Sequence, residues 1–276
     1  MSLPPIITPD ELNELQADRN VVICDVRWYM DNRSGQEAYL EGHLPGAIFV
    51  DLDEHLTAPP RPSAGRHPLP AAASLATGLG ALGISADDVV VAYDDAAGMS
   101  VGRLAWMLRI LGQPAALLDG GIQLWPGDLE QVINRRPSVF CPIRPWPTDC
   151  LASADETELA AQRGERVLDA RAAERFRGDV EPIDRKAGHI PGAVNHPFST
   201  NLDDSGRFLS SDELRSRYEA TGVTESTSTI VYCGSGVSAC HNLLAMERAG
   251  LTQPRLYPGS WSQWSRDDSR SVATGP

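Results

Sequence analysis

The chain has 276 residues, of which 42% are hydrophobic and 22% charged, a composition typical of folded globular proteins and sufficient for two domains of about 130 residues each. Its 24 lysines and arginines against 37 aspartates and glutamates give a net charge of −13, which argues against binding to nucleic acid or to an anionic membrane. The sequence contains no apolar run of the roughly 18 to 20 residues that a membrane span needs, and no signal-peptide pattern, so we expect a cytoplasmic protein.

The cysteines favour a reducing compartment. They are odd in number, and they form neither a CxxC pair nor a zinc-ligand spacing: Cys24, Cys141, Cys150, Cys233 and Cys240. We therefore expect no disulfide framework and no metal site. No glycine fingerprint of a nucleotide-binding loop is present either, so no cofactor is expected.

Short apolar strands alternate with helical patterns along the chain. Strands are predicted within the apolar runs at residues 21–27, 89–94, 167–171 and 229–233, and helices over 71–82, 101–111, 211–221 and 238–249. This alternation favours an α/β fold with largely parallel sheets covered by helices.

A proline-rich segment separates two similar halves. Residues 126–152 contain five prolines and little periodicity, which is typical of a connector because proline removes backbone donors and interrupts regular structure. We therefore expect an N-terminal domain over 1–130, a connector over 131–152 and a C-terminal domain over 153–276.

The two halves repeat four segments in the same order. The loop GHLPGA at 42–47 recurs as GHIPGA at 188–193, and each follows an apolar run that ends in an acid-x-Arg triplet. Further on, a strand enters a small-residue loop at Asp94 in the first half and at Cys233 in the second, and a tryptophan follows 31 residues after each. This order indicates a duplication, in which Asp94 and Cys233 occupy equivalent positions.

Cys233 is the candidate nucleophile. It follows a predicted strand and precedes a glycine-containing loop and a helix, where free backbone N–H groups and the helix dipole stabilise a thiolate. The alternative is a small, inert, buried side chain at the end of a strand. The glycine-rich loop, and the replacement of the cysteine by Asp94 in the other half, favour the nucleophile. We expect the other four cysteines to have no catalytic role, and His43 and His189 to hold turns by bonding to backbone.

The repeated loops, the strand-Cys-loop-helix segment and the closing segment Gly259–Trp264 together resemble the rhodanese family, specifically its two-domain sulfurtransferases. The resemblance implies two tandem rhodanese-like domains, each a mostly parallel sheet flanked by helices, with an inactive N-terminal domain and the catalytic cysteine in the C-terminal one. It also implies that Cys233 takes a sulfane sulfur from a small anionic donor, thiosulfate or 3-mercaptopyruvate. The resulting persulfide passes its sulfur to cyanide or to a thiol, such as that of a thioredoxin-like protein.

The loop after Cys233 is similar to that of the mercaptopyruvate branch of the family. The resemblance implies three catalytic side chains besides the cysteine, namely Ser235, Asp53 and His67. It also implies that the loop binds the substrate sulfur through Gly234, Gly236, Val237 and Ser238. Ser238 stands where the branch usually has threonine, a change that keeps the hydroxyl group.

The resemblance also implies a pair of arginines for the anionic end of the donor. Arg175 matches the first, and a guanidinium suits a carboxylate or a sulfonate-like group. The second usually follows a Glu-Pro-x-Pro run directly. Here the run is shorter and has aspartate at position 184, so that Arg185 is the nearest arginine. The sequence therefore leaves both the role of Arg185 and the choice between thiosulfate and 3-mercaptopyruvate open.

Two other functions use a cysteine in such a loop. A cysteine phosphatase needs an arginine six residues after the cysteine, where this chain has Ala239, so phosphatase activity is disfavoured. A persulfide relay or a regulatory binding module without sustained turnover would use the same Cys233, and it stays open as the alternative.

Overall fold

The computed structural model describes residues 3–31, 33–251 and 254–276, and the chain divides into two compact units. The first unit comprises residues 1–58, 70–146 and 205–207, and the second comprises 59–69, 147–204 and 208–276. The segment 59–69 thus lies in the N-terminal half of the sequence but belongs to the second unit.

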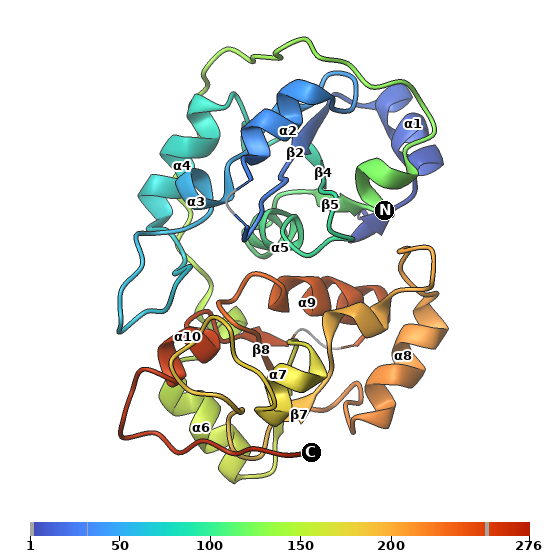
Figure 1. Ribbon diagram of the computed structural model, residues 1–276. Coiled ribbons are helices and arrows are strands. Elements are labelled where there is room, and N and C mark those ends of the chain that lie inside the picture. Colours follow the sequence, from blue (N-terminus) through green and yellow to red (C-terminus); the bar gives the residue numbers. More distant parts are fainter. Residues whose placement is uncertain (1–2, 32, 252–253) are drawn as a thin grey trace. The chain divides into compact units, whose positions relative to one another are not determined.

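The first unit contains a five-stranded sheet in the order β1-β5-β4-β2-β3, in which every neighbouring pair is parallel (Figure 1). Its strands are β1 (Ile6–Ile7), β2 (Val21–Asp25), β3 (Ile48–Phe49), β4 (Val89–Tyr93) and β5 (Ala115–Leu118). In the centre, Ile23 pairs with Val91, and Val91 pairs with Ala116. All three side chains are buried, as expected for a parallel sheet that helices flank.

The second unit contains a four-stranded parallel sheet in the order β7-β6-β8-β9. Its strands are β6 (Arg166–Asp169), β7 (Val194–Asn195), β8 (Thr229–Tyr232) and β9 (Arg255–Leu256). This order corresponds to β3-β2-β4-β5 of the first unit. Trp261 and Trp264 complete the core beside Tyr232. The predicted fold class, two α/β domains with parallel sheets flanked by helices, is confirmed.

Three of the helices begin at a capping box. Thr8, Ser153 and Ser210 each form a capping box with a glutamate three residues later. The α-helices are α1 (Pro9–Asp18), α2 (Gly35–Glu41), α3 (Leu52–His55), α4 (Ala72–Ala81), α5 (Gly102–Ile110), α6 (Ala154–Gln162), α7 (Ala173–Arg177), α8 (Ser211–Ala220), α9 (Ala239–Arg248) and α10 (Ser260–Trp264). Short 3₁₀ helices are η1 (Gly121–Leu124), η2 (Thr148–Cys150) and η3 (Phe198–Asn201). Among the described residues, no helix has the length and apolar character that a membrane crossing requires.

The duplication is visible in matched buried contacts. Arg27 Nη2 lies 2.6 Å from Asp25 Oδ2 in the first unit, and Arg171 Nη2 lies 2.6 Å from Asp169 Oδ2 in the second. Each guanidinium also donates to a loop carbonyl 2.7 Å away. The same acid-x-Arg triplet therefore ties the same loop to the same strand in both units.

The repeated histidines are structural, as predicted. His43 Nδ1 lies 2.7 Å from the carbonyl oxygen of Tyr39, and His189 Nδ1 lies 2.8 Å from that of Phe176. The His43 imidazole also stacks on the Tyr39 ring, and the His189 imidazole stacks on the Phe176 ring, with ring centroids 3.8 and 3.7 Å apart. Burial lowers the pKa of His189, although its bond to the Phe176 carbonyl opposes this shift.

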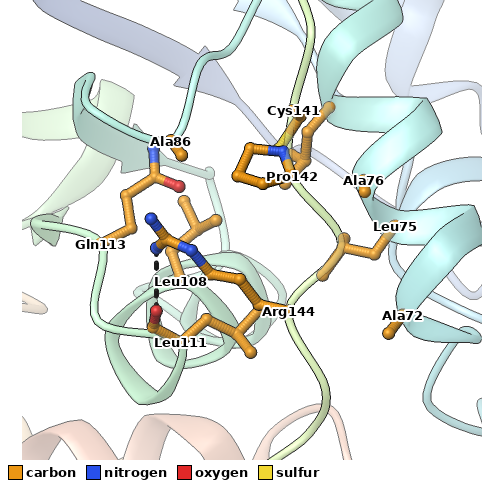
Figure 2. A pocket seen from close by; sticks show the side chains of 11 residues that line it. Ala72, Leu75, Ala76, Ala86, Leu108, Leu111, Gln113, Cys141, Pro142 and Arg144 are labelled. Atoms are coloured by element: carbon orange, nitrogen blue, oxygen red, sulfur yellow. Dashed lines mark hydrogen bonds between the residues drawn. The ribbon is translucent and has the colours of Figure 1, made fainter.

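Residues 131–146 of the connector belong to the first unit and contain no helix or strand, whereas its residues 147–152 belong to the second unit. Figure 2 shows a pocket between α4 and α5 that Cys141, Pro142 and Arg144 line from this segment. Arg144 Nη1 donates to the carbonyl oxygen of Leu111 at 2.9 Å. Burial raises the pKa of the Cys141 thiol, which disfavours the thiolate.

Candidate active site

Cys233 stands at the carboxyl end of β8 and is 1% exposed. Its backbone N–H donates to Ser260 Oγ at 3.2 Å, which ties the end of β8 to the start of α10. Its Sγ accepts a hydrogen bond from the backbone N–H of Gly236 at 3.1 Å. Gly236 has φ of +77°, a left-handed conformation that glycine adopts without strain. The glycine thus lets the loop turn a backbone donor toward the sulfur.

The rest of this loop offers further donors. The backbone N–H groups of Gly234, Ser235, Val237 and Ser238 have no hydrogen-bond acceptor among the described residues. The helix α9 follows at once, so its positive N-terminal end adds to the field of these amides. Such an arrangement suits a negative charge on Cys233 or on a sulfur atom bound to it.

Asp94 occupies the corresponding loop of the first unit and is fully buried. Its carboxylate accepts five hydrogen bonds of 2.8 to 3.0 Å, from the N–H groups of Ala96, Gly98, Ser100 and Val101 and from the hydroxyl group of Ser100. The loop of the first unit therefore holds a carboxyl side chain at the position where the second unit has the Cys233 thiol.

Asp94 and Cys233 accept the same kind of backbone hydrogen bond. The N–H of Ile122 donates to the carbonyl oxygen of Asp94 at 3.1 Å, and the N–H of Trp261 donates to that of Cys233 at 3.0 Å. Ile122 and Trp261 are also equivalent in the repeat, because each precedes its matched tryptophan by three residues. The loop that binds a carboxylate in one unit thus has a thiol at its centre in the other.

Two of the predicted catalytic side chains meet at the Cys233 loop. Ser235 Oγ lies 2.7 Å from His67 Nδ1, although 168 residues separate them in the sequence. His67 belongs to the segment 59–69, which is held against α10 by two bonds. The Arg66 N–H donates to Ser262 Oγ at 3.0 Å, and Gln263 Nε2 donates to the Ser63 carbonyl oxygen at 2.6 Å.

Arg175 reaches the same loop from α7. A Cβ atom placed on Gly234 would lie 3.5 Å from Arg175 Nη1, so the guanidinium lies beside the residue that follows Cys233. Arg175 Nη2 donates to Glu181 at 2.7 Å and to Asp184 at 3.2 Å. Its Nε is buried and has no hydrogen-bond partner among the described residues. Arg175 therefore has one buried donor that none of the described residues accepts.

A second guanidinium, which the sequence analysis missed, lies at the same place. The Cβ position on Gly234 is 3.0 Å from Arg66 Nη2, and Arg66 Nη1 forms an ion pair with Asp184. The only signal in the sequence is that Arg66 directly precedes His67, a residue expected in the site. That signal depends on knowing that the segment 59–69 packs onto the second unit.

Two buried carboxylates neutralise these arginines. Burial raises the pKa of Glu181, but its bonds from Arg175 and from the backbone of Asp184 and Ile183 outweigh burial and leave this pKa lowered. Asp184, whose side chain is 2% exposed, has a raised pKa because burial and the charge of Glu181 outweigh the attraction of Arg66 and Arg175. The charges of the two arginines and two acids cancel when all four are ionised.

The other two predicted residues have partners of their own. The Arg185 side chain is 60% exposed and pairs with Asp268 at 3.3 Å. Asp53 belongs to the first unit, where it accepts a hydrogen bond from Trp28 Nε1 at 2.9 Å.

Comparison with known proteins places this geometry in a family. A model of the rhodanese-like domain matches the chain twice, over residues 8–128 and 153–267. The chain is 42% identical to a probable 3-mercaptopyruvate sulfurtransferase of Pseudomonas aeruginosa, with all of both chains covered. It is 41% identical to a putative thiosulfate sulfurtransferase, SseB, of Mycobacterium tuberculosis, with 98% of this chain and 97% of the relative covered.

A solved structure agrees. The crystal structure of SseA from Escherichia coli matches with a TM-score of 0.77 at 30% identity, over 94% of this chain and 99% of that one. The chain belongs to the rhodanese-like family. Within that family it is a two-domain enzyme of the sulfurtransferase class.

Proposed function

We propose that Cys233 carries sulfur as a persulfide and that the preferred donor is 3-mercaptopyruvate. The observation that carries the proposal is the loop around Cys233, in which the Gly236 N–H bonds the sulfur and the N–H groups of Gly234, Ser235, Val237 and Ser238 have no acceptor within the part of the chain that the structure describes. These donors stabilise the thiolate that attacks and then the charge on the persulfide that forms.

In the first half-reaction, the Cys233 thiolate attacks the sulfur of the donor. An S–S bond forms and the donor's C–S bond breaks, so that pyruvate leaves as its enolate and takes up a proton. The Ser235 hydroxyl, bonded to His67, supplies a route for that proton. In the second half-reaction cyanide attacks the outer sulfur, which releases thiocyanate and restores the thiolate.

The choice of donor follows from charge. No cationic residue stands in the loop between Cys233 and α9, where it could pair with a dianion such as thiosulfate. The planar guanidinium of Arg175 suits a carboxylate, which can accept two parallel hydrogen bonds. These features favour a monocarboxylate such as 3-mercaptopyruvate.

The acceptor and the compartment belong to the same proposal. All five cysteines are free thiols, which is consistent with a reducing cytoplasm, where a thioredoxin-like dithiol is a suitable sulfur acceptor. Residues Gly234, Val237 and Ser238 would hold the donor's sulfur through their N–H groups. Asp53 is proposed as a further catalytic residue on family resemblance alone.

The test is kcat/KM with 3-mercaptopyruvate and with thiosulfate, cyanide being the acceptor, for the wild type and for Cys233→Ser. We expect a preference for 3-mercaptopyruvate that disappears in the variant. A preference for thiosulfate contradicts the proposed donor. Addition of one sulfur atom to Cys233 without release of thiocyanate, measured by mass spectrometry, contradicts turnover and favours the persulfide relay.

A further inference from the structure

We infer that Arg66 is the second donor-binding cation of this enzyme and that Asp184 is a built-in counterion which the donor's carboxylate must displace. This inference rests on the proposed function, because it concerns how the same site binds its donor. It assigns to the segment 59–69 the role that the sequence could not assign within the run 181–185.

The position of Arg66 is the first argument. Its Nη2 and Arg175 Nη1 lie 3.0 and 3.5 Å from one point, the place of a Cβ on Gly234. Gly234 directly follows the nucleophile, so both guanidiniums lie beside the residue next to Cys233 in the chain. Two planar groups from different segments can bind the carboxylate and the neighbouring keto oxygen of a 2-keto acid.

The backbone around Arg66 is held firmly, as a binding residue requires. The Arg66 N–H donates to Ser262 Oγ, which itself donates to the Gly259 carbonyl oxygen at 3.1 Å. At Gly65, φ is +88°, and a Cβ would lie 2.6 Å from that same carbonyl oxygen. The glycine therefore allows the segment to approach α10 closely, and it fixes the point from which Arg66 extends.

Asp184 joins the two arginines. It bonds both Arg66 and Arg175 while its side chain is almost wholly buried. An incoming carboxylate needs the same N–H donors, so the donor and Asp184 compete for them. Glu181 already balances one positive charge, and with Asp184 ionised the pair of arginines has no net charge left to attract a dianion. Asp184 thus weakens donor binding in general and thiosulfate binding most.

The experiment compares Arg66→Gln, Arg66→Lys and the matched control Arg177→Gln. Arg177 lies on α7 two residues from Arg175, but its half-exposed side chain pairs with Asp179. We expect Arg66→Gln to raise the KM for 3-mercaptopyruvate about 10- to 100-fold, because a charged hydrogen-bonded contact is lost. The KM of Arg66→Lys should lie between those of the wild type and Arg66→Gln. Arg177→Gln should change the KM less than about twofold. The rate at which cyanide discharges a preformed persulfide should be unchanged in all three.

Asp184→Asn tests whether Asp184 competes with the donor for Arg66 and Arg175 or only forms a structural ion pair with them. If Asp184 competes with the donor, this variant lowers the KM for donors and raises the ratio of thiosulfate to 3-mercaptopyruvate activity. If the Arg66–Asp184 pair only holds the fold, Asp184→Asn and Arg66→Gln impair the enzyme in the same direction. Thermal melting of each variant shows whether it is folded. If Arg66→Gln is not folded, Arg66→Lys provides the test instead.

The outcomes distinguish the two proposals. A wild type that transfers sulfur while Arg66→Gln keeps a normal KM overturns the inference and leaves the proposed function standing. The inference is also overturned, and the proposed function stands, if Arg185→Gln raises the KM for the donor and Arg66→Gln does not. A wild type that turns over no donor overturns the proposed function, and calorimetric binding of pyruvate to the wild type and Arg66→Gln then tests the inference alone.

Discussion

Replacing Asp94 by alanine tests whether the loop of the first unit is a structural anion site with no part in the chemistry. The buried carboxylate accepts five hydrogen bonds, four from backbone N–H groups and one from the Ser100 hydroxyl. Alanine leaves these donors without their acceptor. The variant should therefore lose stability, but it should retain sulfur transfer at temperatures where it is folded.

The size of the loss follows from those bonds. A hydrogen bond to a charged group contributes about 1.5 to 3 kcal/mol, and an unsatisfied buried donor costs about 1 to 3 kcal/mol. The five effects do not add, because water can enter the space that the carboxylate leaves and satisfy some of the donors. We expect a loss of about 4 kcal/mol, which corresponds to a decrease of about 10 to 15 °C in the melting temperature of this unit.

Differential scanning calorimetry measures this shift, with Asp87→Ala as the control. Asp87 is exposed in the same unit, so its replacement should change stability by less than about 0.5 kcal/mol. The kcat of Asp94→Ala, measured at 20 °C, should be close to that of the wild type. A shift as small as that of the control refutes the account of the loop, and loss of activity in a folded variant shows that Asp94 contributes to catalysis.

Three further predictions concern the second unit. Cys233→Ser should abolish thiocyanate formation while the protein stays folded, and activity above a few per cent of wild type contradicts Cys233 as the nucleophile. Arg175→Gln should raise the KM for the donor with little change in the dependence on cyanide; the opposite pattern moves this residue to the acceptor step. The pKa of Glu181 is lowered, so its carboxylate stabilises the fold at neutral pH and this contribution is lost as the pH falls through that lowered value. Glu181→Gln should therefore lower the melting temperature at pH 7 and have a much smaller effect once the pH is below that lowered pKa, and an equal effect under both conditions contradicts the ionic role.

Much of the fold could be predicted from local patterns. Buried strands such as β4 and β8 appear in the sequence as runs of β-branched residues, and the capping serines and glutamates mark where helices begin. The duplication adds information that one domain alone lacks, since the repeat pairs Cys233 with Asp94 in the sequence itself. The structural role of His43 and His189 followed from the same comparison, because both halves keep them.

The cationic part of the site could not be predicted in the same way. The resemblance implies a second arginine at the run 181–185, where Arg185 is the nearest arginine in the sequence. In the structure Arg185 pairs with Asp268 near the surface, while Arg66 pairs with buried Asp184, 118 residues away. An ion pair depends on the distance between two side chains in space, and the pattern of residues along the chain does not give that distance for residues far apart in the sequence.

The sequence by itself therefore determined the two α/β domains, the thiol at the end of a strand and the amide-rich loop that follows it, because each depends on neighbouring residues. Only the tertiary structure decided that the segment 59–69 belongs to the second unit, that His67 bonds Ser235, and that Arg66 and Arg175 share Asp184. These contacts join segments whose packing is set by the whole core. The chemistry of the nucleophile is thus a local property of the chain, whereas the charge that meets the donor is a property of the fold.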